Sequence, residues 1–170
     1  MRRCAKEIKI GNVKIGGENP VLVQSMLNVP ISDIDGNIRQ ALELQNAGCQ
    51  IVRVTVPTLD DVKIITALKK AIDIPLVADI HFDYKVAVAA AEAGVDKIRI
   101  NPGNIGNDEN VKQVVDACKM RNIPIRIGVN AGSLEKNILE KYGKPTPEAL
   151  VESALYHVSL LEKFDFTDIV

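Results

Sequence analysis

The chain has 170 residues and a mass of 18.5 kDa, and 46% of its side chains are hydrophobic. This apolar content excludes an intrinsically disordered chain and is enough to bury one sizeable core. The formal net charge of −1 and the 4% of aromatic residues exclude a generally basic surface with many base-stacking platforms, so no nucleic-acid partner is expected.

The hydrophobic runs and the cysteines of the sequence indicate the cellular compartment in which we expect the protein. No apolar run approaches the roughly 20 residues of a membrane span, so no membrane partner is expected. Residues 1–7 are basic and lack the apolar core of a signal peptide. The cysteines at positions 4, 49 and 118 include no CxxC pair, which indicates neither a disulfide framework nor a metal site. We therefore expect a reduced, soluble, cytoplasmic protein whose chain holds no metal.

In chain order, the first expected element is a β-hairpin. Residues 7–17 alternate polar and apolar side chains around the pair Gly11-Asn12, and we expect this hairpin to lie across one end of the fold. Beyond it, short β-branched runs alternate with amphipathic helical windows, which is typical of βα units and a parallel sheet. The expected strands are residues 21–26, 51–56, 76–80, 97–100 and 125–129, with a sixth starting at 167–170.

Capping residues and glycines delimit the helices between these strands. Thr58 precedes acidic residues at one helix start, and Asp83 caps a helix over residues 84–93. Thr146 followed by a proline and an acid opens a helix that runs to about Lys163. Further helical windows are residues 38–47, which Gly48 ends, and the segment around residues 111–118.

An internal repeat refines the fold class. Residues 47–54 match residues 93–100, residues 74–76 match residues 123–125, and each spacing covers two βα units. A two-unit period suits a (β/α) TIM-type barrel, in which alternate strands contribute to the same interior layers, and a full barrel needs about 250 residues. We therefore expect an α/β, TIM-type barrel that is truncated, with about five complete βα units, the start of a sixth strand and an N-terminal β-hairpin.

Polar side chains occupy alternate positions in these apolar strands. Because side chains alternate between the two faces of a strand, the polar set lies opposite the valines and isoleucines that must face the helices. It therefore points toward the barrel axis, near the carboxyl ends of the strands, where barrel enzymes hold their active sites. The set comprises Arg53, Asp79, His81, Arg99, Asn101, Arg126 and Asn130.

This set contains three arginines but only one carboxylate, that of Asp79. Burying an unpartnered arginine costs several kcal/mol, so about two positive charges remain for an external anion. The planar guanidinium suits bidentate binding of phosphate oxygens, at roughly 1.5–3 kcal/mol for each charge-assisted hydrogen bond. The alternative is that internal salt bridges neutralise the arginines, although the strands offer few acids for this.

The loops after the fourth and fifth strands, residues 101–106 and 128–133, are rich in glycine and asparagine. Such loops can direct backbone N–H groups toward a phosphate, but the same composition is equally typical of ordinary βα turns that bind nothing. Asp79 and His81 are compatible with metal binding, proton transfer or orientation of a substrate hydroxyl. The lack of a second nearby histidine favours the last two.

Five strings along the chain resemble one enzyme family. They are VQSM (23–26), RVTVP (53–57), LVADIHF (76–82), KIRINPGNIG (97–106) and IRIGVNAGSL (125–134). In this order they resemble the 4-hydroxy-3-methylbut-2-enyl diphosphate synthases, the IspG or GcpE family, across essentially the whole chain. The last two strings together are highly specific.

The resemblance implies an oxidoreductase of non-mevalonate isoprenoid (terpenoid) biosynthesis. Such enzymes convert 2-C-methyl-D-erythritol 2,4-cyclodiphosphate to 4-hydroxy-3-methylbut-2-enyl diphosphate, with electrons passed from ferredoxin or flavodoxin through a four-iron four-sulfur cluster. The resemblance also implies that Arg53, Arg99 and Arg126 hold the diphosphate with Asn130 nearby, and that Asp79 and His81 contact the hydroxyl end. Asn101 completes the expected substrate-binding set, and the catalytic residues stay unassigned.

The same resemblance implies a domain organisation. Residues 1–170 are expected to be an incomplete substrate-binding barrel, with the C-terminal iron–sulfur domain and the cluster ligands absent from this chain. The fragment is expected to bind no cluster and to be inactive alone. Two other interpretations stay open: a non-catalytic barrel fragment that forms homo-oligomers through open strand edges, and another phosphate-substrate barrel enzyme such as a dihydropteroate synthase.

Overall fold

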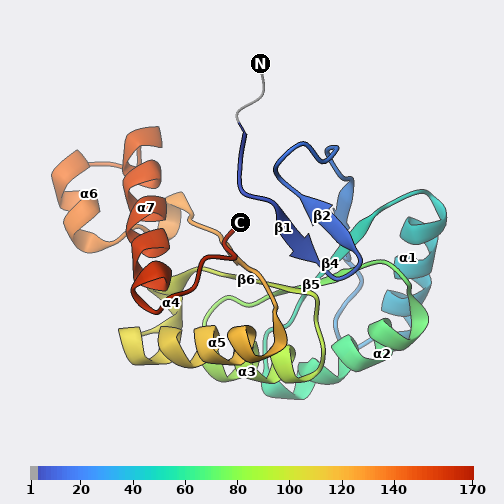
Figure 1. The fold of residues 1–170 in the computed structure, drawn as a ribbon. Coiled ribbons are helices and arrows are strands. Elements are labelled where there is room, and N and C mark those ends of the chain that lie inside the picture. The colour runs from blue at the N-terminus through green and yellow to red at the C-terminus, as the bar shows by residue number, and fades with distance from the viewer. Residues whose placement is uncertain (1–3) are drawn as a thin grey trace.

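The computed structural model describes residues 4–170 as a curved parallel sheet with helices along one side (Figure 1). Five strands pair in the order β3-β4-β5-β6-β7, each parallel to its neighbour. Their bounds are β3 (Gln24–Met26), β4 (Ile51–Thr55), β5 (Leu76–Asp79), β6 (Lys97–Ile100) and β7 (Ile125–Ile127). Spatial order that follows chain order is the arrangement of a (β/α) barrel wall, which confirms the predicted fold class.

A helix follows each strand. The helices are α1 (Ile34–Asn46), α2 (Lys63–Ala71), α3 (Tyr84–Glu92), α4 (Pro102–Ile105), α5 (Asp108–Arg121), α6 (Lys136–Tyr142) and α7 (Pro147–Lys163). The 3₁₀ turns η1 (Leu59–Val62) and η2 (Ala131–Ser133) add to them. Two of the predicted caps form, because Asp83 Oδ1 accepts from Lys85 N at 2.8 Å and Thr146 Oγ1 accepts from Ala149 N at 3.2 Å. Figure 1 shows α2, α3 and α5 below the sheet and α1 at its right-hand end.

The main core lies between the sheet and these helices. Strand residues such as Val52, Val54 and Ile98 are buried there with the apolar faces of the helices. Each is flanked in its strand by a residue of the opposite face, as the period-two pattern requires. The helix-facing side of the sheet is therefore the apolar side that the sequence predicts.

The hairpin of β1 (Ile8–Ile10) and β2 (Val13–Ile15) closes the opposite side of the sheet at the amino ends of the strands. Its strands pair antiparallel. Ile8 and Ile10 pack with Ile51 and Val77 in a second, smaller core. The predicted hairpin and its place across one end of the fold are thus confirmed.

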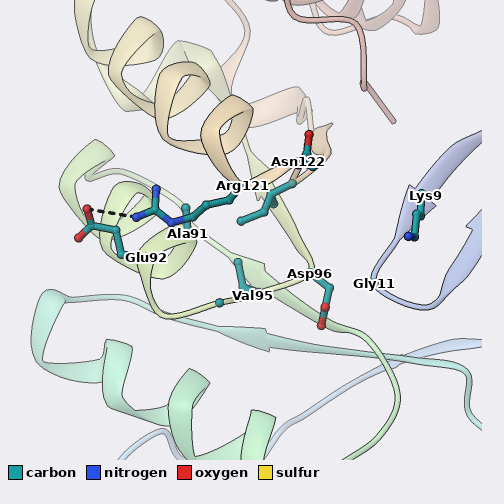
Figure 2. A pocket seen from close by; sticks show the side chains of 10 residues that line it. Lys9, Gly11, Ala91, Glu92, Val95, Asp96, Arg121 and Asn122 are labelled. Atoms are coloured by element: carbon teal, nitrogen blue, oxygen red, sulfur yellow. Dashed lines mark ion pairs between the residues drawn. The ribbon is translucent and has the colours of Figure 1, made fainter.

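A cavity of about 360 Å³ lies beside the hairpin turn (Figure 2). Lys9 and Gly11 of the hairpin form one wall, and Asp96 and Arg121 lie on the other. None of the residues predicted to bind substrate lines this cavity, so it is separate from the polar positions of the strands.

The boundaries of several elements differ from the prediction. The first strand of the sheet was expected to start at residue 21, but β3 begins only at Gln24. Just before it, the carbonyl of Val23 accepts from the backbone N–H groups of both Gln50 and Ile51, which is not the pattern of a regular parallel ladder. The expected sixth strand is reduced to a parallel bridge between Ile125 and Ile169. The segments predicted as loops after β6 and β7 contain the short helix α4 and the 3₁₀ turn η2.

Candidate functional site

The inward face of the sheet brings the predicted charged residues together. Asp79 on β5 contacts Arg53 on β4 and Arg99 on β6, the two neighbouring strands. Their strand neighbours Val54 and Ile98 lie in the helix-facing core. The side-chain alternation predicted from the sequence is therefore the alternation observed.

Asp79 is the shared counter-ion of this cluster. Its carboxylate is only 1% exposed, and it accepts from Arg53 Nη2 at 2.7 Å through Oδ2 and from Arg99 Nη1 at 3.1 Å through Oδ1. His81 Nε2 lies 3.3 Å from the same Oδ2. One carboxylate thus serves two permanent cations and an imidazole, which leaves the cluster with excess positive charge.

Arg99 is held in a slot that depends on a glycine. Its Nη2 donates to the carbonyl of Gly128 at 2.9 Å. A Cβ atom at Gly128 would lie 1.9 Å from Arg99 Nε, well inside the closest approach of real Cβ contacts. Gly128 therefore carries no side chain because the guanidinium occupies that space.

Arg126 lies in the same group of charges and makes no ion pair with any residue in the described part of the chain. Burial lowers the pKa of its guanidinium, and repulsion from Arg53 and Arg99 lowers it further, while Asp79 opposes the shift. Arg126 is therefore a partly buried cation beside two like charges, with only Asp79 opposing them. An anion placed beside Arg126 would remove this repulsion.

Lys97 is a fifth member of the charged set that the sequence reasoning missed. It is 4% exposed, and burial followed by repulsion from Arg126 and Arg53 lowers the pKa of its amine to about 8. Its Nζ donates to Gln24 Oε1 at 3.4 Å. The signal was available, because Lys97 precedes Arg99 by two residues and so shares its face.

The remaining predicted residues surround this cluster in different ways. With its amide oxygen toward the guanidinium, Asn130 accepts from Arg99 Nη2 at 3.3 Å and donates to the carbonyl of Val129 at 3.1 Å. Asn101 is buried and engaged locally, since it accepts from Gly103 N at 3.1 Å and donates to Ser133 Oγ at 2.7 Å. Asn101 therefore joins the loops after β6 and β7 instead of pointing a free amide into the site.

The iron–sulfur cluster implied by the resemblance needs several thiolate ligands, and the described residues do not fit it. Burial raises the pKa of the Cys118 thiol to about 12, which disfavours the thiolate that binds metal. Cys49 is also buried, with its Sγ 3.1 Å from the carbonyl of Ile51. Across residues 4–170, no three His, Cys, Asp or Glu side chains gather as metal ligands.

Comparison with known proteins identifies close relatives. The family described as "GcpE TIM-barrel domain" matches residues 5–170. A 4-hydroxy-3-methylbut-2-en-1-yl diphosphate synthase (flavodoxin) from Caldanaerobacter subterraneus is 61% identical over 170 residues, and the one from Fusobacterium nucleatum is 56% identical over 170 residues. Each alignment covers 100% of this chain and 48% of the relative, so the chain spans about half the length of these curated relatives.

Solved structures support the fold. A 7,8-dihydropteroate synthase from Vibrio fischeri superposes with a TM-score of 0.69 at 14% sequence identity, covering 97% of this chain and 65% of that one. At this identity the likeness carries the barrel architecture and no activity. Among the helices of residues 4–170, none has the length and apolar character needed to cross a bilayer.

Proposed function

Because the chain belongs to the GcpE TIM-barrel family, we propose that it forms the substrate-binding barrel portion of a 4-hydroxy-3-methylbut-2-en-1-yl diphosphate synthase. The proposed substrate is 2-C-methyl-D-erythritol 2,4-cyclodiphosphate. Its conversion takes up two electrons and two protons, breaks the ring C–O bond and releases one hydroxyl as water, which leaves the linear allylic diphosphate. This places the protein in the non-mevalonate isoprenoid pathway.

One observation carries the proposal: three arginines and a lysine lie on the inner face of the sheet, and the carboxylate of Asp79 pairs with only two of them. Arg53 and Arg99 both contact Asp79, while Arg126 and Lys97 are destabilised as cations by their neighbours. A diphosphate supplies the negative charge that this group lacks. Guanidinium forks bind its oxygens through charge-assisted hydrogen bonds.

The chain's own residues then have the following roles in the proposal. Arg53, Arg99 and Arg126 bind the diphosphate, and Asn130 supports Arg99. Asp79 keeps the guanidinium groups in place and, with His81, faces the hydroxyl-bearing end of the substrate. Asn101 contributes by joining the two loops around the site.

The electron supply and the domain organisation also belong to the proposal. The relatives' names include flavodoxin, so flavodoxin, with ferredoxin as the other option, is the proposed electron donor of the full enzyme. The iron–sulfur cluster would be held outside residues 1–170 by a separate C-terminal domain. This chain alone, in the cytoplasm, would bind the substrate weakly and reduce none of it.

Titration with inorganic diphosphate tests the binding site. Arg126→Ala should weaken binding by about 1.5–3 kcal/mol, the contribution of one charge-assisted contact. Isothermal titration calorimetry on wild type and variant measures the difference. Arg121→Ala is the matched control, because Arg121 lies on α5 and pairs only loosely with Glu92 at 3.8 Å (Figure 2). Equal affinity of the Arg126→Ala variant and the wild type would remove Arg126 from the site.

A further inference from the structure

A buried histidine and a partly buried glutamate outside the arginine cluster meet behind the loops of the site. Glu135, at the start of α6, and His157, in the middle of α7, approach to 2.5 Å between Oε1 and Nε2. His157 is 2% exposed. Apart from this contact, neither carboxylate oxygen of Glu135 and neither ring nitrogen of His157 has a hydrogen-bond partner within the described residues.

This pair lies directly against the loop that follows β6. A Cβ atom at Gly103 would be 3.2 Å from Glu135 Oε1 and 3.4 Å from His157 Nε2, so the backbone of α4 rests on the pair. The next contacts lead to the site, because Gly103 N donates to Asn101 Oδ1 at 3.1 Å and Asn101 Nδ2 donates to Ser133 Oγ at 2.7 Å. The pair thus supports Asn101, a side chain that joins the two loops.

Stability alone does not account for the pair. Of the other buried positions of α7, Ala149 and Leu161 are apolar and Ser153 is polar. Replacing a buried polar pair by apolar side chains of similar volume is often neutral or stabilising. Burial lowers the pKa of His157 against the opposing effect of Glu135, so the site disfavours the charged ring. Tyr156, whose ring centroid is 5.2 Å away, is the other titratable neighbour in contact.

We propose that Glu135 and His157 are positioning residues that fix the segment from Asn101 to Gly103 and thereby hold the two loops of the site in their binding arrangement. The inference rests on the proposed function for its ligand, a diphosphate. It goes beyond that function by assigning a role to two residues that do not reach the substrate.

The double variant Glu135→Met/His157→Leu separates positioning from stability, because it replaces both members of the polar pair by apolar side chains. We expect its urea-unfolding midpoint to equal or exceed that of the wild type, whereas His157→Leu alone would leave the Glu135 carboxylate without its partner and would destabilise the fold. We also expect faster hydrogen exchange at the amides of Gly103 and Asn104 in the double variant and roughly fivefold weaker binding of inorganic diphosphate, the loss of about one neutral hydrogen bond. His157→Gln, which retains an N–H donor for Glu135, should keep loop exchange and binding close to those of the wild type. Ser153→Ala, a buried polar substitution on the same helix, is the control.

Three outcomes would overturn the proposal. The first is unchanged loop exchange in the double variant, and the second is a loss of binding that only follows a loss of stability. The third is loop exchange in His157→Gln as fast as in the double variant. If wild-type protein binds no diphosphate, the proposed function fails, whereas the exchange rates of Gly103 and Asn104 still test the positioning role without ligand.

A further substitution covers the case in which the double variant does not fold. Gly103→Ala places a methyl group against Glu135 and should speed exchange at Asn104, whereas the same substitution in a Glu135→Ala background should have a smaller effect. Gly132→Ala is the matched control, since a Cβ atom there meets nothing within 4 Å. Equal effects of Gly103→Ala in both backgrounds would refute the contact on which the proposal depends.

Discussion

Asp79 shows how a single residue organises the charged cluster. A buried carboxylate is costly unless it is paired, and here both of its oxygens accept from guanidinium groups. The arginines gain a common anchor, but one negative charge cannot neutralise Arg53 and Arg99 as well as Arg126. The cluster is therefore pre-arranged for an anion by its own imbalance of charge.

At Gly128 the arrangement of Arg99 depends on the absence of a methyl group. We predict that Gly128→Ala displaces the guanidinium, weakens inorganic diphosphate binding roughly tenfold or more and destabilises the fold by about 1–3 kcal/mol. Calorimetric titration and urea unfolding measure the two effects. Gly132→Ala in the same loop region is the control, because its Cβ atom would meet no atom within 4 Å. Similar behaviour of the two variants would show that Gly128 is not required by Arg99.

At Lys97 the prediction concerns pH. Its folded-state pKa of about 8 lies below the ordinary value of 10.5, so between these values the unfolded chain binds the additional proton. The Lys97 contribution to stability therefore rises as the pH increases from about 8 to 10.5, and below pH 8 the buried charge is a full penalty. Lys97→Met should be more stable than wild type at pH 7, by up to about 3 kcal/mol, and this advantage should vanish near pH 10.5.

Urea unfolding of both proteins at pH 7 and pH 10 tests this expectation. Lys70→Met, at an exposed position of α2, provides the control for the general effect of losing a lysine. A stability difference between Lys97→Met and wild type that is the same at both pH values would show that Lys97 does not titrate in this range.

Strand periodicity predicted the arginine cluster from sequence because position in a strand fixes the face of each side chain. The alternation of side chains identified Arg53, Arg99 and Arg126 as inward-facing. The same alternation places Lys97 on the inward face, although Lys97 was not among the predicted residues. Periodicity gave no indication that Glu135 meets His157. That contact depends on how α6 and α7 pack against each other, and neither helix has a sequence motif that predicts it.

At the scale of elements, the hairpin turn is fixed by one close approach. Gly11 has φ +54°, and a Cβ atom there would lie 2.8 Å from Asp96 Oδ1. Asp96 has little freedom to move, because its Oδ2 accepts from Lys69 Nζ at 2.6 Å and from Leu76 N at 2.8 Å. Figure 2 shows Asp96 beside the hairpin turn. The turn thus docks the hairpin against β5 and β6.

Gly11→Ala tests this docking. Gly94→Ala provides the control, since Gly94 has φ +87° and its Cβ atom would meet nothing within 4 Å, so it measures the backbone strain alone. We expect strain of about 1–2 kcal/mol in both variants and a further loss of about 1–2 kcal/mol in Gly11→Ala from the contact with Asp96. Urea unfolding gives both values, and equal losses would show that Asp96 yields to the methyl group.

Element boundaries were harder to predict than element order. Strands β4, β5 and β6 lie inside the sheet and carry buried apolar residues at alternate positions, so their places follow from the sequence. β3 lies at the edge of the sheet, where fewer contacts impose a ladder, and it is shorter than expected. Helix α4 has four residues, too few for a periodic pattern to reveal.

For the molecule as a whole, the sheet ends in strands with open sides. β3 has no strand partner on its outer side in the described sheet, and on the opposite side β7 is followed only by the bridge to Ile169. Val21, Val23 and Met26 are exposed near the β3 edge, with Val21 81% accessible. Unpaired backbone groups beside exposed apolar side chains are a template for pairing with another strand.

We therefore predict that the 170-residue chain self-associates through the β3 edge, as the homo-oligomer expected from its sequence. Light scattering over a range of concentrations should show a mass that increases with concentration. Val23→Lys should shift this association to concentrations at least roughly tenfold higher, because a charged side chain at an edge strand disfavours pairing. Met120→Lys, at an exposed position of α5 away from the edge, should not. A monomer at every concentration, or equal effects of the two lysines, would exclude the edge as the interface, because only pairing at β3 places Val23 between two chains.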